Sequence, residues 1–559
     1  MTEPTPNAVN ALADRFWDAI LEMQPTTATM YGDERFADRL EDPSEAGREK
    51  ALALWRSTSR EVEAIPTEAL AVEDRITLDM IRVVCALGVE EHDQRIDVLR
   101  VVDQMGGPQT LLPALVQFQK ADTPERLEKF EGRLNAYPAF MAACADLLRD
   151  GLASGLTAPR IVAERTIAQI ERLLEIPVDE SPVVGAVQVA SDADRERVRD
   201  IVRDVVRPAD AAFLEALRGP YLAASRTDPG IWSAPNGEAL YRTAIRAWTT
   251  LEMAPGEIHQ IGLDEIGSIE AERRAIAKRE GFGDDSVAYR THTEAEPSNT
   301  PRTKDEMLAR ASEDIDRAMA LAPRYFGTLP RAGIEVRAVE EFKEADAPFA
   351  YYYPPSTDGA RPGIYYANGY DLPSRKYAKL ATTTYHEAVP GHHFQIALEM
   401  ENPNLTTFRR LGSRMVGGAF VEGWGLYSER LADEMGLFRN EAERFGMLDA
   451  QAWRAARLVV DTGMHALRWT RQQSIDYLLS AGLSLTDATI ETDRYIAWPA
   501  QALTYKLGQR AIEQLRRQLT ARDGSRFDLR EFHDQVLGHG SLPLATLERE
   551  LPGWVTAPA

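Results

Sequence analysis

Three of the nine histidines of this chain lie within one stretch of eight residues, at His386, His392 and His393, and Glu387 directly follows the first of them. Neutral imidazole is the commonest protein ligand of transition metals, and a glutamate beside such a histidine is the usual base of zinc hydrolases. The alternative is a kinked core helix with stacked histidines, but three buried imidazoles would all need polar partners. The stretch therefore predicts a metal site, and the fold has to bring these side chains together.

The spacing between His386 and His392 does not fit a metal bound to one straight helix. Six residues correspond to a rise of about 9 Å, whereas two nitrogens that each lie roughly 2 Å from one zinc ion must be much closer together. Pro390 and Gly391 can break the helix, because proline lacks an N–H and glycine tolerates unusual dihedral angles. We therefore expect the chain to loop or bulge there, so that His392 returns to the metal. His393 would point about 100° away around a helix and orient a ligand or the substrate.

A candidate third ligand, Glu422, lies further along the chain. It stands in an apolar, glycine-broken helical stretch at 419–429. Two histidines and one glutamate, with a fourth position open for water, form a catalytic rather than a structural zinc site. The sequence therefore favours a metal that takes part in chemistry.

The pattern His-Glu-x-x-Pro-Gly-His-His-x-Gln at 386–395, followed by Phe-x-Glu-Gly-Trp-x-x-Tyr-x-Glu at 420–429, resembles the bacterial domain-of-unknown-function 885 family. That family in turn resembles the thimet oligopeptidase and oligopeptidase F group of zinc metallopeptidases. In that group glycine precedes the second ligand, and the third ligand lies in a Phe-Val-Glu stretch. Gly391-His392 and Phe420-Val421-Glu422 match those positions, apart from a two-residue insertion after Glu387.

This resemblance implies a large, mainly α, zincin-like fold of the gluzincin type, with a deep central cleft. It implies one zinc ion per chain, held by His386, His392 and Glu422, and it favours His392 over His393 as the second ligand. The substrate that it implies is a short peptide, because a deep cleft excludes folded proteins.

The expected chemistry is metal-assisted hydrolysis. Zinc lowers the pKa of bound water from about 15.7 to about 7, and Glu387 would take the proton as the water attacks a carbonyl. The same residues could hydrolyse a non-peptide amide or an ester, and a metal-binding scaffold without turnover is a further alternative. Whether a peptidase of this kind would act within a peptide or at one of its ends stays open.

Charge and composition exclude several other classes of function. The formal net charge is −23, so a nucleic-acid backbone would be repelled. No window approaches 18 uninterrupted apolar residues, which argues against a membrane span. The first residues lack a basic region followed by an apolar run, so we expect the chain to be cytoplasmic. We also expect it to be a monomer or a homodimer. The two cysteines, Cys85 and Cys144, are predicted to be buried free thiols in a reducing compartment.

The helical pattern suggests two halves. Residues 1–225 are predicted to form an N-terminal helical half, in which Val9, Leu12, Phe16 and Ile20 illustrate the 3.6-residue period. Residues 226–559 are predicted to form the catalytic helical half. It would contain a small β subdomain at about 334–370 and the metal motifs at 386–429. The polar stretch 281–303 is predicted to be a loop.

A short β segment precedes the histidine stretch. Residues 334–339 alternate in polarity, and the runs 350–353 and 363–368 have the composition of strands. They predict a small hairpin, which is either a decorative subdomain or one whose edge strand lines the cleft and holds an extended peptide by main-chain hydrogen bonds. Under the second interpretation the candidate substrate contacts are Tyr365, Tyr366, Asn368 and, beside the turn, Arg361. An arginine on a turn is, however, usually just solvated.

The C-terminal helices supply the remaining candidates. Arg457, Asp461 and His465 recur at i, i+4 and i+8 on one helical stripe. An Arg-Tyr motif and a Pro-x-Gln-x-x-x-Tyr-Lys-x-Gly motif at 494–508 match the same family. Tyr505 is the first choice for a donor to the oxyanion and His465 the second. The motif also provides three candidate substrate contacts, namely Arg494, Gln501 and Lys506.

Overall fold

The computed structural model describes residues 8–187, 191–340, 344, 347–356, 359 and 361–555. They divide into two compact units. The first comprises Met1–Ala244 with two later segments, Gly463–Ser474 and Thr489–Pro499, and the second comprises Ile245–Thr462, Ile475–Ala488 and Ala500–Ala559. The structure thus divides the chain after residue 244 rather than after 225, and it assigns two segments of the predicted catalytic half to the N-terminal unit.

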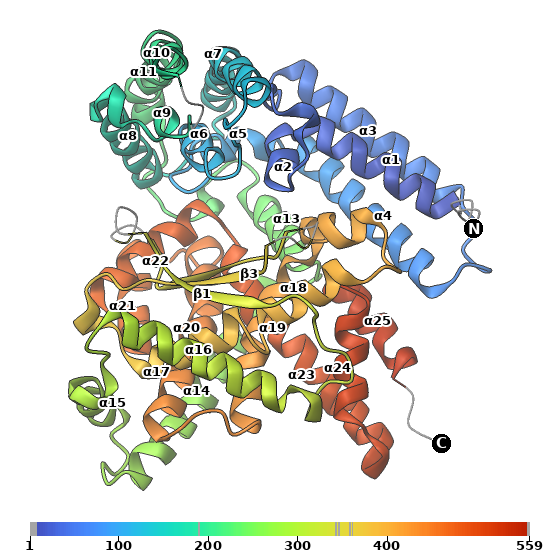
Figure 1. The fold of residues 1–559 in the computed structure, drawn as a ribbon, viewed down its shortest axis with the longest axis vertical. Coiled ribbons are helices and arrows are strands. Elements are labelled where there is room, and N and C mark those ends of the chain that lie inside the picture. The colour runs from blue at the N-terminus through green and yellow to red at the C-terminus, as the bar shows by residue number, and fades with distance from the viewer. Residues whose placement is uncertain are drawn as a thin grey trace. The chain divides into compact units, whose positions relative to one another are not determined.

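The N-terminal unit consists of helices (Figure 1). In α1 the apolar residues Val9, Leu12, Phe16 and Ile20 recur every three or four positions and are buried, which confirms the predicted helical period. Cys85 and Cys144 are buried free thiols, as predicted. The helices are α1 (Ala8–Met23), α2 (Pro25–Met30), α3 (Glu45–Glu63), α4 (Val72–Asp93), α5 (Ile96–Arg100), α6 (Leu111–Leu115), α7 (Pro124–Ser154), α8 (Arg160–Glu175), α9 (Pro182–Gly185), α10 (Asp192–Ile201), α11 (Arg207–Ala216) and α12 (Leu222–Ala224).

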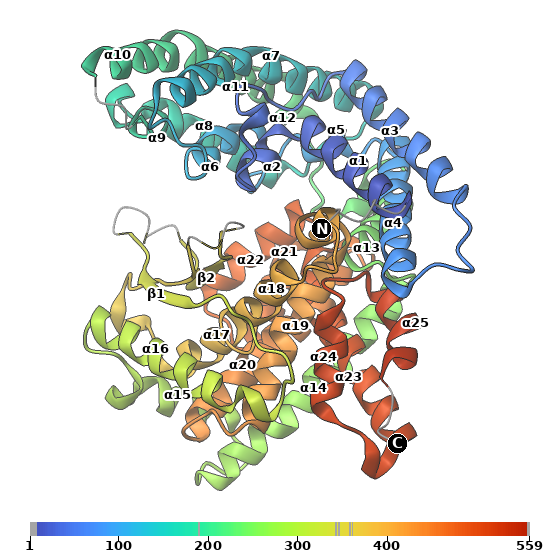
Figure 2. The same cartoon turned by 45° about the vertical axis from the view of Figure 1, so that its right-hand side comes forward.

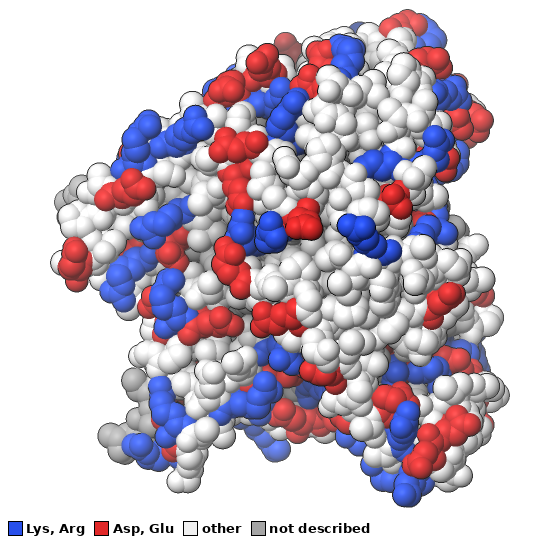
Figure 3. All heavy atoms as spheres, turned by 180° about the vertical axis from the view of Figure 1, so that it is seen from behind, with Lys and Arg blue, Asp and Glu red and all other residues white. Residues whose placement is uncertain are grey.

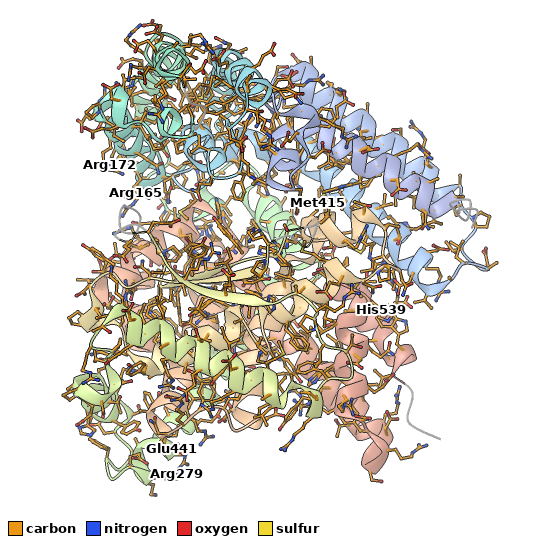
Figure 4. All side chains as sticks on the ribbon, viewed as in Figure 1. Arg165, Arg172, Arg279, Met415, Glu441 and His539 are labelled. Atoms are coloured by element: carbon orange, nitrogen blue, oxygen red, sulfur yellow. The ribbon has the colours of Figure 1, made fainter. Side chains whose placement is uncertain are left out.

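The C-terminal unit is helical around one small sheet. Figure 4 labels Arg279 and Glu441, which form an ion pair at 2.8 Å between the end of α14 and the start of α20. The helices within this unit are α14 (Pro255–Arg279), α15 (Ser286–Ala295), α16 (Lys304–Leu321), α17 (Tyr377–Glu387), α18 (His392–Glu401), α19 (Arg414–Glu434), α23 (Thr504–Asp523), α24 (Leu529–Gly538) and α25 (Leu544–Trp554). Four helices have residues in both units: α13 (Gly237–Thr249), α20 (Glu441–His465), α21 (Arg471–Ala481) and α22 (Leu485–Ala497).

The sheet has three strands in the order β1-β3-β2, namely β1 (Ile334–Ala338), β2 (Ala350–Tyr353) and β3 (Gly363–Ala367). β2 and β3 pair antiparallel, which confirms the predicted hairpin, and β1 adds to β3 in parallel. β2 therefore lies at an edge of the sheet, and it also contacts α17 (Figure 2). Tyr365 of β3 is fully buried and accepts a hydrogen bond from Thr384 of α17 at 3.3 Å. The sheet is thus fastened to the helix that carries the first histidine.

The prediction of a loop at 281–303 is wrong in part, because α15 forms within it. Asp285 caps this helix by accepting a hydrogen bond from the backbone N–H of Ala288 at 2.9 Å. Tyr289 on its first turns is buried and contacts the ring of Phe445 edge-on. A side-chain cap and one tertiary contact stabilise this helix, although its polar composition had predicted a loop.

The helices α19 and α23 cross with their backbones in contact at Gly423 and Gly508. A Cβ atom at Gly423 would overlap the backbone of Gly508, and one at Gly508 would overlap the carbonyl of Ala419. Only glycine at both positions permits this distance between the helix axes. The crossing places residues 419–423 of α19 beside Gly508 and Gln509 of α23.

The surface carries both signs of charge. On the face in Figure 3, acidic and basic side chains are intermingled on each unit. The acidic excess of the sequence is therefore spread over this face rather than gathered into one patch. Among the described residues, no helix has the length and apolar character needed to cross a membrane.

A buried carboxyl group in the N-terminal unit makes stability depend on pH. Burial raises the pKa of Asp210 from 3.8 to about 6, although the Tyr137 hydroxyl donates a hydrogen bond to this carboxylate at 2.8 Å and Arg207 lies near it. The folded protein therefore binds this proton more tightly than the unfolded chain. The resulting stabilisation is complete below about pH 4 and is lost as the pH rises through about 6.

We predict that the free energy of unfolding of the wild type falls by about 1 kcal/mol more between pH 5 and pH 8 than that of Asp210→Asn. Urea denaturation at each pH measures the difference. Asp204→Asn removes an exposed carboxylate whose pKa is lowered by Arg203, and it serves as the control that keeps the wild-type slope. Equal slopes for the wild type and Asp210→Asn would contradict this account.

Candidate metal centre

Three elements of the C-terminal unit bring four functional side chains together. His386 Nε2 and His392 Nε2 lie 3.8 and 3.6 Å from the same oxygen, Oε2 of Glu422. The two imidazole rings are 4.7 Å apart between centroids and almost perpendicular. Glu387 belongs to the same group, because its carboxylate and one nitrogen of each histidine all lie within 4.8 Å of one another. The structure therefore assembles the predicted ligands and the predicted base.

The insertion after Glu387 is a loop between two helices. α17 ends at Glu387, and α18 begins at His392. Between them the carbonyl oxygen of Pro390 accepts hydrogen bonds from Trp424 Nε1 at 2.9 Å and from Ser428 Oγ at 3.2 Å, both on α19. The expected departure from helical geometry is therefore present, and α19 holds the loop that returns His392 to His386.

One face of α19 lies against the centre. Glu422, Gly425 and Glu429 recur at i, i+3 and i+7, so they lie along the same side of the helix. A Cβ atom at Gly425 would lie 2.8 Å from Nε2 of His386 and 3.0 Å from Cε1 of His392. The glycine therefore lets both imidazoles approach the helix backbone between the two carboxylates.

Glu429 orients the first histidine. Its Oε1 accepts a hydrogen bond from His386 Nδ1 at 2.9 Å, so Nε2 is the ring nitrogen that faces Glu422. A carboxylate behind a ligating histidine fixes the tautomer and ring orientation and raises the basicity of the ligand. Nδ1 of His392 is buried and has no hydrogen-bond partner among the described residues. Glu429 was not among the residues predicted for the site, although its spacing of seven from Glu422 could have indicated it.

The electrostatics of the centre favour a cation. Burial alone would lower the pKa of His386, but hydrogen bonds to Glu422 and Glu429 raise it to about 9. Burial works against ionisation of Glu422, yet the two histidines hold its pKa far below the usual range. Burial raises the pKa of Glu387 against the influence of the same histidines. The carboxylates therefore stabilise positive charge at the imidazoles.

His393 lies on the other side of α18. Its Nε2 donates a hydrogen bond to the carbonyl of Ala332 at 3.1 Å, and its Nδ1 is 3.0 Å from the hydroxyl of Tyr352 on β2. Burial lowers the pKa of His393 to about 4, so the ring is neutral. It joins the sheet to α18, which agrees with the choice of His392 as the ligand and differs from the expected contact with a ligand or substrate.

Tyr505 of α23 lies next to the centre. Its ring is 6.5 Å from that of His386 and nearly parallel to it. The guanidinium of Arg457 lies 4.4 Å from the centroid of the same ring. Arg457 is buried and was predicted only as part of a charge-paired helix face. Its cation–π contact restrains the ring of Tyr505.

Two predicted residues belong to the N-terminal unit. His465 is buried there, with Nδ1 accepting from the backbone N–H of Ile231 at 3.1 Å and Nε2 donating to the carbonyl of Tyr495 at 2.9 Å. Both ring nitrogens are therefore engaged by the backbone, and the structure does not support His465 as an oxyanion donor. Arg494 pairs with Glu491 at 3.2 Å.

The four substrate contacts predicted in the β segment differ in how much of each side chain is buried or held by other residues. Tyr365 is fully buried, and the amide of Asn368 donates to the carbonyls of Glu344, Ala347 and Pro348. Arg361 is tied to the carbonyl of Pro354 at 2.7 Å. Tyr366 stacks on Tyr351 of β2, with 4.9 Å between the ring centroids. Of these four side chains, only Tyr366 and Arg361 remain accessible to a ligand.

Gln501 and Lys506 are buried as well, so their prediction as substrate contacts is not supported. Nζ of Lys506 donates to Oε1 of Gln451 at 2.9 Å and to Oε1 of Gln509 at 2.7 Å. Burial lowers the pKa of Lys506 to about 8 against the influence of Glu265. Lys506 is therefore a polar group of the core, and its partners are side chains of the protein rather than a substrate.

Comparison with known proteins shows the family to which the chain belongs. The family model "Bacterial protein of unknown function (DUF885)" matches residues 25–551, and the chain belongs to that family. "The crystal structure of the putative lipoprotein from Colwellia psychrerythraea" is similar at 30% identity, covering 98% of each chain with a TM-score of 0.90. "The structure of a putative lipoprotein of unknown function from Shewanella oneidensis" shares the fold at 19% identity, covering 97% of this chain and 99% of its own, with a TM-score of 0.77. A search of curated proteins finds no match.

We predict opposite effects for two glycine substitutions within α19. Gly425→Ala should lower the free energy of unfolding by about 1–3 kcal/mol, because its methyl group would press on both imidazoles. Gly418→Ala meets no atom within 4 Å and should raise that free energy by up to about 1 kcal/mol, since it only reduces the freedom of the unfolded chain. Urea denaturation measures both variants. An unchanged or higher free energy of unfolding in Gly425→Ala would show that the imidazoles do not rest on Gly425.

Proposed function

We propose that the chain is a zinc-dependent hydrolase that cleaves peptide bonds in short peptides. The observation that carries this proposal is the approach of His386 Nε2 and His392 Nε2 to one oxygen of Glu422, at 3.8 and 3.6 Å. Two ligand atoms about 2.1 Å from a tetrahedral zinc ion are about 3.4 Å apart. The donor set therefore fits one zinc ion per chain, with a glutamate beside it that is not needed as a ligand.

The metal would be held by His386, His392 and Glu422. When bound, zinc supplies a Lewis acid that polarises a carbonyl and makes a water molecule more acidic. Glu422 keeps 27% of its side chain exposed, whereas His386 keeps 3%. One side of the centre is therefore accessible, which supports a catalytic role, since structural zinc sites are closed.

Glu387 is the proposed general base. It accepts a proton from the attacking water and returns that proton to the amine that leaves. Glu387 is half-buried and its carboxylate is close to both histidines. It is therefore already placed to take a proton from a water molecule at the centre. General acid–base catalysis of this kind contributes about 10²–10⁴-fold.

Tyr505 is the proposed donor to the oxyanion. Its ring lies beside that of His386, and Arg457 packs on it. A donor that is already oriented stabilises negative charge as that charge develops on the carbonyl oxygen. The contact with Arg457 supports this role, because it restricts the tyrosine ring.

A peptide is the proposed substrate on two grounds. One is the resemblance of the sequence motifs to zinc metallopeptidases. The other is the position of β2, an edge strand that contacts α17 and could pair with an extended chain. A non-peptide amide or an ester is the alternative substrate, and a metal-binding scaffold without turnover is the alternative function. The open side of the centre favours a hydrolase over the scaffold.

The cellular location has two alternatives. The sequence predicts the cytoplasm, whereas the names of the two solved relatives are those of lipoproteins and favour a place outside it. Fractionation of the source cells distinguishes them.

We predict that the purified chain binds one zinc ion, and that His386→Ala and Glu422→Ala each lose it. Metal analysis after dialysis measures the occupancy. His292→Ala is the matched control, because His292 is half exposed and lies in α15 outside the centre. Full occupancy in both centre variants would refute the ligand assignment.

We predict that Glu387→Gln keeps its zinc and hydrolyses peptides at least about 10²-fold more slowly, because an amide cannot accept the proton. Incubation with a mixture of short peptides, read by mass spectrometry, measures the cleavage. Cleavage of amide or ester probes alone would favour the alternative substrate. A variant as fast as the wild type would rule out Glu387 as the base.

A further inference from the structure

We propose that Lys506, a buried lysine of α23, is a positioning residue for the imidazole of His386. It acts through two side chains that lie between them, Gln451 of α20 and Glu429 of α19. The inference rests on the proposed function, since it concerns the way in which a metal ligand is held.

An unbroken series of hydrogen bonds joins these residues. Nζ of Lys506 donates to Oε1 of Gln451 at 2.9 Å, and Nε2 of Gln451 donates to Oε2 of Glu429 at 3.2 Å. The other oxygen of Glu429 accepts from Nδ1 of His386 at 2.9 Å. All four residues are at most 2% exposed. Water therefore cannot readily replace any member of the series.

The groups on both sides of Gln451 fix the direction of the series. Nε2 of Gln451 donates to the carbonyl of Leu426 at 3.1 Å as well as to Glu429, and both of these groups only accept. The ammonium group of Lys506 has donors only, so it is the group that holds the oxygen of Gln451. If the amide of Gln451 were reversed, its oxygen would face the carboxylate of Glu429, and two acceptors would repel each other. With Gln451 held this way, Glu429 keeps one oxygen for Nδ1–H of His386. Nε2 of His386 is then the ring nitrogen that faces the centre.

Packing alone does not account for a charge at this position. Burying an ammonium group is costly unless partners satisfy it, and an apolar chain of similar length would fill the same space. Besides Gln451, its partners are Oε1 of Gln509 at 2.7 Å and Oε2 of Glu265 at 3.7 Å. These contacts satisfy the charge. What the lysine adds over a methionine is a donor that holds the oxygen of Gln451 in place.

The experiment measures the zinc dissociation constant of the full-length chain by competition with a chromophoric chelator, with circular dichroism as the check on folding. Lys506→Met should weaken zinc binding about 10-fold or more, in the range typical of residues that orient a ligand. Gln509→Met removes the other amide partner of Lys506 and should leave zinc affinity unchanged. The double variant Gln451→Met/Lys506→Met should bind as Gln451→Met does, because the lysine acts only through Gln451.

Gln451→Glu separates orientation from packing, and it decides the matter if Lys506→Met does not fold. It keeps an acceptor for Lys506 but places a second carboxylate against Glu429, so zinc binding should weaken about 10-fold or more while the fold is kept. Wild-type affinity in Gln451→Glu, or equal losses in Lys506→Met and Gln509→Met, would overturn the inference alone. A wild-type chain that binds no zinc would overturn the proposed function as well.

Discussion

The candidate centre depends on the contact between the backbones of α19 and α23. Gly423 and Gly508 let the two helices touch, so side chains on either flank come within hydrogen-bonding or stacking range. Glu422 and Glu429 of α19 reach the histidines on one side of this crossing, and Tyr505 approaches from α23. A side chain at either glycine would push the helices apart, and the positions of the ligands would change with them.

Around this crossing, charge is distributed so that positive charge is stabilised at one point. Glu422 and Glu429 flank His386, and the remaining oxygen of Glu429 is held by the amide of Gln451. In surroundings from which water is excluded, each of these contacts is stronger than it would be at the surface. Under the proposed function a cation would complete this centre, and the partly exposed Glu422 would leave that cation accessible.

Much of the fold and part of the centre could be predicted from the sequence. Helical periods such as that of α1, the hairpin of β2 with β3 and the return of His392 to His386 all follow from local patterns or from the spacing of motifs. Glu429, Gln451 and Arg457 could not be assigned in this way, since their roles arise from contacts between helices distant in sequence. Lys506 and His465 were misplaced for the same reason: residue type suggests chemistry, but burial and the partners of each polar atom determine the role.

The central claim is that His386, His392 and Glu422 share one metal ion. Anomalous diffraction from crystals of the zinc-loaded protein, recorded on both sides of the zinc absorption edge, tests it most directly. The account predicts a single strong peak per chain, about 2 Å from Nε2 of both histidines and from a carboxylate oxygen of Glu422. A peak at another position, or none between these three residues, would contradict it.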